Sequence, residues 1–124
     1  MKSKGYEDLI VYQRAYKLSM EIFEVSKQFP KEEKYSLTDQ IRRSSRSVPV
    51  NIASAYRRRQ YPKHFSSKIT DANEEATETQ VWLKIANDCK YLDEQIKNKL
   101  YKEYEEVGSM LGSMANSPEK FLPR

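Results

Sequence analysis

The chain has 124 residues and a formal net charge of +4, which fits one domain with a modest core. Aromatic residues make up 11% of it, too many for a disordered chain. A single cysteine excludes an internal disulfide, and no apolar run forms a signal peptide or approaches the ~20 residues of a membrane span. We therefore expect one cytoplasmic domain over residues 1–124, with tails at 1–5 and 117–124 and no membrane association.

Apolar residues at helical spacing predict a first helix over residues 6–28. Two neighbouring rows of apolar side chains give this helix a wide apolar face. One row is Leu9, Tyr12, Tyr16, Met20 and Phe23, and the other is Val11, Ala15, Leu18, Ile22 and Val25. Pro30 ends the helix, because the residue before a proline avoids the helical backbone region.

A second helix is predicted to begin after Ser36, which can cap it with Asp39 as the partner of a weak capping box, and to run to Arg59. Its apolar row is Leu37, Ile41, Ser44, Val48, Ile52 and Ala55. Pro49 lies inside this helix, where a proline removes one hydrogen bond and clashes with the carbonyl four residues earlier. We therefore predict a kink at Pro49, with two separate helices joined at Ser47 as the alternative.

The third predicted helix, residues 62–91, has the most regular pattern in the chain, with apolar positions alternately four and three residues apart. These positions are Phe65, Ile69, Ala72, Ala76, Thr79, Leu83 and Ala86. Such a heptad row indicates near-parallel helix packing. A second row of Trp82, Ile85, Cys89 and Leu92 broadens the apolar face, so we expect Cys89 in the core.

Asp93 is predicted to cap a fourth helix, whose inward positions are Ile96, Leu100, Tyr104, Val107, Leu111 and Met114. Gly108 and Gly112 either allow a neighbouring helix to approach closely or mark fraying of this helix. With only three glycines in the chain, long helices with few turns are favoured. The expected fold is all-α, an up-down-up-down four-helix bundle.

The basic block, residues 41–70, concentrates positive charge that the rest of the chain lacks. It contains eight Lys and Arg residues and no Asp or Glu, although the whole chain is only +4. The eight are Arg42, Arg43, Arg46, Arg57, Arg58, Arg59, Lys63 and Lys68. One interpretation is binding of nucleic-acid phosphates by the arginines and Lys63, with Tyr56, Tyr61 and His64 stacking on unpaired bases. The other is pairing of these cations with acids of the third helix, inside or between subunits. Those acids are Asp71, Glu74, Glu75, Glu78 and Asp88.

No pattern in the chain predicts catalysis, a metal or a cofactor. Glu74 and Glu78 are four residues apart, but bundle-type metal sites need a Glu-x-x-His pair, and the single histidine, His64, lies outside that spacing. Catalytic triads and glycine-rich phosphate loops are absent from the sequence. We expect Asn51 to bond backbone groups that Pro49 frees, and the functional alternative is contact with a base or ligand.

Six short motifs carry a family resemblance, and the most diagnostic is Ser-Val-Pro-Val-Asn-Ile-Ala. They occupy residues 6–15, 29–37, 40–45, 47–53, 78–80 and 91–93. Through them the chain resembles the small bacterial 23S rRNA intervening-sequence proteins, to which the accessory protein of diversity-generating retroelements is related. Ser54 and Ala55 stand where that family usually has Glu-Gly, which leaves the basic block of this chain more purely positive.

The resemblance implies a four-helix bundle that forms ring-shaped homo-oligomers, typically pentamers, with a basic surface for nucleic acid. The family is named after genes inside insertions of ribosomal RNA, which is a location and not an activity. We therefore expect a non-catalytic homo-oligomer that binds RNA or DNA through its basic second helix. A scaffold that docks a protein partner is the competing hypothesis, and nuclease treatment distinguishes the two because a protein partner survives it.

Overall fold

The computed structural model describes residues 5–123, so residues 1–4 and 124 of the predicted tails lie outside the described residues. This part of the chain forms four α-helices: α1 (Ile10–Ser26), α2 (Leu37–Arg57), α3 (Pro62–Asp88) and α4 (Glu94–Asn116). Three short 3-10 helices flank them: η1 (Gly5–Asp8), η2 (Lys31–Glu33) and η3 (Pro118–Phe121). In η3, Phe121 stacks on Phe65 with ring centroids 5.2 Å apart, which ties the end of the chain to α3.

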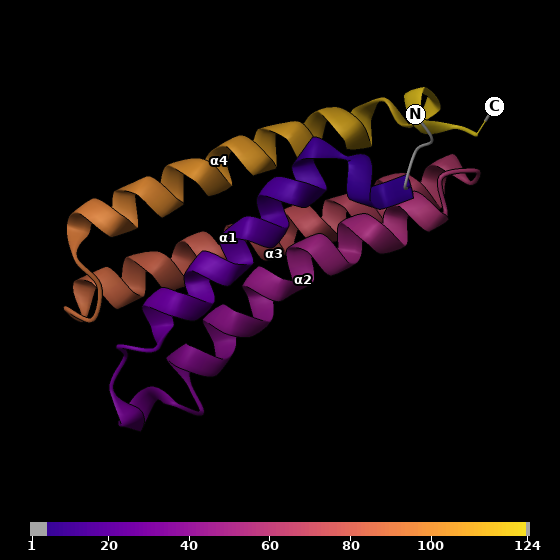
Figure 1. The fold of residues 1–124 in the computed structure, drawn as a ribbon. Helices are drawn as coiled ribbons and strands as arrows, with labels where there is room; N and C mark the ends of the chain where they lie inside the picture. The colour runs from indigo at the N-terminus through magenta and orange to yellow at the C-terminus, as the bar shows by residue number, and fades with distance from the viewer. Residues whose placement is uncertain (1–4, 124) are drawn as a thin grey trace.

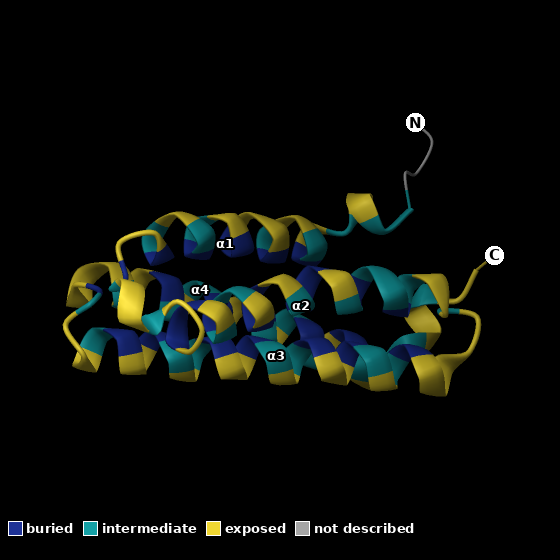
Figure 2. Cartoon of the chain, turned by 90° about the horizontal axis from the view of Figure 1, so that it is seen from below, coloured by how far each residue is buried: buried dark blue, intermediate teal, exposed yellow. Residues whose placement is uncertain are grey.

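The helices run up, down, up and down, and each is antiparallel to the next along the chain, as Figure 1 shows. The connection between α2 and α3 lies at the same end of the bundle as both termini, whereas the connection between α1 and α2 lies at the other end (Figure 1). The buried residues lie on the sides of the helices that face one another, and exposed residues lie on their outer sides (Figure 2). The prediction of an all-α four-helix bundle is therefore confirmed.

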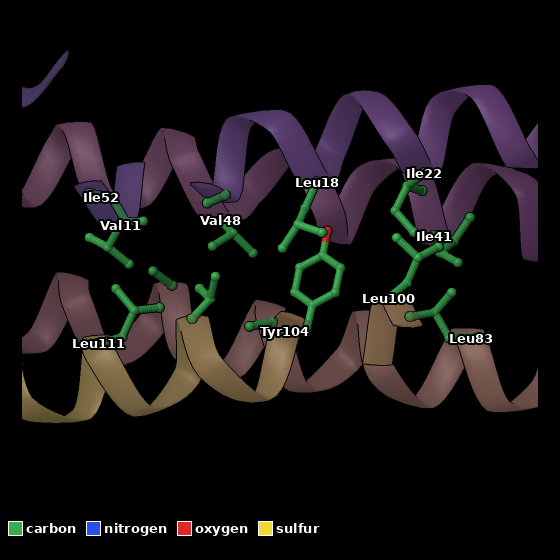
Figure 3. Packing of buried hydrophobic residues seen from close by; sticks show 14 of the residues in the cluster. Val11, Leu18, Ile22, Ile41, Val48, Ile52, Leu83, Leu100, Tyr104 and Leu111 are labelled. Carbon is green, nitrogen blue, oxygen red and sulfur yellow. The ribbon is translucent and has the colours of Figure 1, made fainter. Parts of the chain in front are cut away.

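The core joins all four helices and is built from the rows that the spacing predicted for α2 and α3. All seven heptad positions of α3 and all six positions of the α2 row are buried. Ile22 and Ile41 meet Leu100 and Leu83 across the interior, as seen in Figure 3. Burying one such aliphatic side chain contributes about 1.5–3 kcal/mol, so this core is the main source of stability.

Small and hydroxyl-bearing residues bring α2 and α3 close together. The hydroxyls of Ser44 on α2 and Thr79 on α3 are 2.8 Å apart, and both residues are buried. Each hydroxyl also has a backbone acceptor on its own helix, the Glu75 carbonyl at 2.9 Å for Thr79 and the Ile41 carbonyl at 3.4 Å for Ser44. The polar pair is satisfied inside the core and costs little to bury.

The predicted kink at Pro49 is not confirmed, and the alternative of two separate helices is wrong. Helix α2 continues without interruption from Leu37 to Arg57, with Pro49 buried inside it. The Asn51 side chain donates to the carbonyl of Ser47 at 2.9 Å. The carbonyl that Pro49 frees is that of Ser45, four residues before the proline. The Asn51 side chain therefore bonds a different backbone group from the one that the proline frees.

Only one of the two apolar rows of α1 is covered along its length. Val11, Ala15, Leu18 and Ile22 are buried, but Tyr16 is 52% exposed and Met20 is 48% exposed. Helix periodicity shows that a face is apolar, but the neighbouring helices decide how much of it they cover. The second row of α3 also fails, since Ile85 is exposed and Cys89 is exposed too. At Cys89 the reason is that α3 ends at Asp88 and the chain turns away through Lys90 at a φ of 68°.

One of the two predicted helix caps forms and the other does not. Asp93 caps α4 by accepting a hydrogen bond from the Ile96 amide at 2.8 Å, which confirms that prediction. Ser36 makes no side-chain capping bond on α2. Instead, Glu33 accepts from the Leu37 amide at 3.3 Å and from the Ser36 hydroxyl at 2.6 Å. A carboxylate is well suited to this place, since it also compensates the positive end of the helix dipole.

Glu33 also links the α1–α2 connection to the turn between α3 and α4. The Tyr91 hydroxyl donates to its second carboxylate oxygen at 2.9 Å. The hydrogen bonds from Ser36 and then Tyr91 lower the pKa of Glu33 below its ordinary value. The same contact raises the pKa of Tyr91 to about 12, because its proton is held by the carboxylate.

Candidate nucleic-acid interface

Seven of the eight cations of the basic block separate into two clusters on the bundle, and the eighth, Lys68, lies further along α3. Arg42, Arg43 and Arg46 lie in the first half of α2. The turn cluster lies around the α2–α3 connection and consists of Arg57, Arg58, Arg59, Tyr61, Lys63 and His64. At 1.5 Å per residue, Arg42 and Arg57 are about 22 Å apart along the helix axis. A stretch that is continuous in sequence therefore forms two separate surfaces.

The first cluster lines a groove of about 510 Å³ on α2, which we call the basic groove. Its charged members are Lys34, Asp39, Arg42, Arg43 and Arg46, and its other members include Tyr35, Ser47 and Val50. Four cations thus share one groove with a single carboxylate. This excess of positive charge favours binding of an anion.

Arg42 and Arg46 are positioned by an aromatic ring of α1. The guanidinium carbons of Arg42 and Arg46 lie 4.8 and 5.6 Å from the centroid of Phe23. Arg42 Nε also donates to the Ser26 hydroxyl at 2.8 Å. The cation–π contacts and this hydrogen bond hold the two side chains in place, and the terminal nitrogens of Arg42 keep their donors for a phosphate.

The predicted pairing of the basic block with acids of α3 does not occur as direct ion pairs inside the subunit. Within residues 5–123 the ion pairs are Arg14–Glu106, Lys27–Glu24, Lys99–Glu21 and Lys99–Glu103, and none involves the block. Arg43 is an electrostatic neighbour of Glu75, but burial and Glu78 raise the pKa of Glu75 despite it. Pairing of Glu74, Glu75 or Glu78 with arginines of another subunit stays a prediction.

In the turn cluster, one of the four cations contacts its own chain and the other three are exposed. Arg59 folds back on Tyr56, with its guanidinium carbon 4.1 Å from the ring centroid and Nη1 donating to the Tyr56 carbonyl at 3.0 Å. Arg57, Arg58 and Lys63 are exposed. Tyr61 and His64 are exposed around the same connection, with ring centroids 5.9 Å apart, and stacking of these rings on bases stays a prediction.

The structure adds residues that the sequence reasoning did not assign to a site. A second groove, of about 480 Å³ and lined mainly by apolar side chains, lies between α1 and α2, and we call it the apolar groove. Its lining includes Tyr6, Tyr12, Tyr16, Met20 and Pro49. Three of these residues, Tyr12, Tyr16 and Met20, belong to an apolar row that helical spacing predicts for the first helix. Lys34 and Tyr35 lie outside the basic block and in the turn before α2, although the spacing of four residues from Lys34 to Thr38 and Arg42 would place all three on one face of a helix.

The described part of the chain lacks a cluster of metal ligands and a membrane-spanning helix. Between residues 5 and 123, no three or more His, Cys, Asp or Glu side chains gather closely enough to hold a metal ion. None of the helices in that range has the length and apolar character needed to cross a membrane.

These observations define a class, the all-α four-helix bundle with a basic surface on its second helix. Within that class, the chain belongs to the 23S rRNA-intervening sequence protein family, whose model matches residues 7–113. A solved structure from Bacteroides thetaiotaomicron, a protein of unknown function from the S23 ribosomal protein family, is similar to it with a TM-score of 0.78 and 25% identity. The match covers 86% of this chain and 96% of that one. No curated protein matches the chain. The resemblance seen in the motifs is thus confirmed.

Proposed function

We propose that the protein is a non-catalytic homo-oligomer that binds RNA through the basic groove of α2, with the turn cluster as a second contact. The observation that carries this proposal is that the described part of the chain leaves the cations of the basic block without direct ion pairs. No member of the block forms an ion pair within residues 5–123, and the groove holds four cations against one carboxylate. A polyanion is the partner that such a surface fits, because each neutralised phosphate releases condensed counterions.

The number of cations in the basic groove sets how strongly RNA binding should depend on salt concentration. If Lys34, Arg42, Arg43 and Arg46 each neutralise one phosphate, log K falls with log salt at a slope of about −3 to −4. The contacts would be with the backbone and not with base edges, so sequence selectivity would be weak.

Exposed apolar side chains on α3, away from the basic groove, support self-association of the chain. Val81 and Ile85 are exposed on α3, at 49% and 38%, one helical turn apart. Exposed apolar side chains grouped in this way favour contact with another protein surface. The family resemblance implies a pentameric ring, in which repeated basic grooves would strengthen RNA binding by avidity. The mass of the particle in solution, by light scattering of wild type and of Val81→Glu/Ile85→Glu, tests this part.

The binding test uses a structured RNA at about 50 and about 200 mM salt. The groove variant is Arg43→Glu/Arg46→Glu, and the turn variant changes Arg57, Arg58 and Arg59 to Glu. Lys84→Glu/Lys102→Glu is the control matched to the groove variant, since both lysines are exposed and lie outside the block. We expect the groove variant to weaken binding most, the turn variant to weaken it less, and the control to bind as wild type does.

Binding that ignores salt and both basic variants would refute the proposal. Capture of an acidic protein partner that persists after nuclease treatment, with no RNA binding, would favour the scaffold function instead.

A further inference from the structure

We propose that the basic groove and the apolar groove together form one binding trough for an unpaired nucleic-acid strand. Phosphates of the strand contact the arginines of α2, and its bases stack on tyrosines of α1 and of the α1–α2 connection. This inference rests on the proposed function and adds the class of nucleic acid, which is single-stranded and not double-stranded.

The two grooves are continuous along α2. Arg46 and Val50 line both of them. Along α2 the lining of the combined trough extends from Thr38 to Ala53, which is about 22 Å at 1.5 Å per residue, and Tyr35 adds to it from the connection before the helix. Its length follows the axis of α2, so a flexible strand can lie in it without bending around the bundle.

The chemistry changes along the trough in a way that suits a single strand. Tyr35 is 85% exposed at the basic end and lies beside Lys34, whose ammonium is 5.3 Å from the ring centroid. Tyr16 is half-exposed at the apolar end, and its ring centroid is 6.0 Å from that of Tyr12. Exposed aromatic rings next to cations are the arrangement that binds single strands by stacking.

Tyr6 and Met20 extend the apolar end. The ring of Tyr6 is edge-on to Tyr12, with centroids 5.0 Å apart and planes at 76°. Together with Met20 and Val50 they give the bases an apolar wall. Since the faces of bases are hidden inside a duplex, this wall offers nothing to double-stranded nucleic acid, whereas an unpaired strand can use it.

Arg46 is the residue that joins the two halves. It lines both grooves, and its guanidinium lies over Phe23. A phosphate on Arg46 therefore lies between bases stacked at the Tyr35 end and bases stacked at the Tyr16 end. The excess of four cations over one carboxylate favours a polyanion over a second apolar protein surface as the occupant.

The test compares an unpaired RNA of about 12 nucleotides with the same RNA annealed to its complement, by fluorescence anisotropy. The variants are Tyr16→Ala and Tyr35→Ala, and the control is Tyr101→Ala, which removes a tyrosine of α4 far from the trough in sequence and outside its lining. We expect each trough variant to weaken single-strand binding by at least about fivefold and to leave duplex binding unchanged. The control binds as wild type does, and thermal melting confirms that all three variants fold.

Three outcomes overturn the inference. If RNA binds with the expected salt dependence but the duplex binds as well as the single strand and the tyrosine variants have no effect, the proposed function stands and the trough does not. If neither RNA binds at any salt concentration, both proposals fail. If Tyr16→Ala lowers the mass of the particle in solution, the apolar groove is an interface between copies of the chain.

Discussion

The most direct test of the core concerns the hydroxyl of Tyr104. Its side chain is 1% exposed and stands from α4 toward Leu18 of α1, as Figure 3 shows. In the described part of the chain its hydroxyl has no hydrogen-bond partner. Burial, together with the nearby carboxylates of Glu21 and Glu103, raises the pKa of Tyr104 far above its ordinary value. The hydroxyl therefore stays protonated and is desolvated without compensation.

The substitution Tyr104→Phe keeps the ring in the core and removes only this hydroxyl. A buried polar group without a partner costs about 1–3 kcal/mol, so the variant should be more stable by at least about 1 kcal/mol. For a chain of this length, 1 kcal/mol corresponds to a rise in Tm of about 4 °C. The measurement is urea denaturation followed by far-UV circular dichroism, with thermal melting as a second readout.

Tyr91→Phe is the matched control, because it removes a tyrosine hydroxyl that does have a partner, the Glu33 carboxylate at 2.9 Å. This variant should be less stable than wild type, so the two identical changes have opposite signs. If Tyr104→Phe is also less stable than wild type, the hydroxyl finds a partner in solution, and our account of this part of the core is wrong.

Two further predictions concern a capping carboxylate and the glycines of α4. Because the pKa of Glu33 is lowered from 4.5 in the fold, its stabilisation is complete above pH 4.5 and is lost as the pH falls below it. Denaturation in a pH series should show Glu33→Gln destabilised at neutral pH and approaching wild type in acid, whereas Glu32→Gln shows no such trend. Gly112→Ala should stabilise α4 by about 0.5–1 kcal/mol, because its added Cβ meets no atom within 4 Å. Gly108→Ala should gain less in the same assay, since its Cβ would lie 3.1 Å from Asn73 Oδ1.

The contrast between these two glycines bears on how α3 and α4 meet. Asn73 Nδ2 donates to the Gly108 carbonyl at 3.3 Å, so the helices do approach closely there. Gly112 has no such neighbour, and α4 continues past it to Asn116. Of the two explanations offered by the sequence, close approach therefore holds at Gly108, while fraying holds at neither position.

The sequence by itself determined the helices and the two best-defined core rows. On α3, the seven row positions from Phe65 to Ala86 are alternately four and three residues apart, and all seven are buried. The α2 row from Leu37 to Ala55 is buried in the same way. Helical periodicity is a local property of the chain. The apolar face of each helix can therefore be predicted without knowing where the neighbouring helices lie.

The candidate site was only partly accessible to such reasoning. Charge counting found Arg42, Arg43 and Arg46, and the structure confirms that they share one surface. Charge counting over a sequence window merged them with the turn cluster, because it ignores the rise of 1.5 Å per residue that places Arg42 and Arg57 about 22 Å apart along α2. It also could not include Tyr35, which joins the groove only because the connection before α2 packs against that helix.

Tertiary structure alone decided which apolar and charged groups are left uncovered. Tyr16 and Met20 have the same spacing as core residues, yet they line an open groove beside α2 and stay about half-exposed. The acids of α3 were numerous enough to neutralise the basic block, yet the ion pairs among residues 5–123 form elsewhere. Burial and ion pairing require two elements to meet in space, and the pattern along one element does not contain that information.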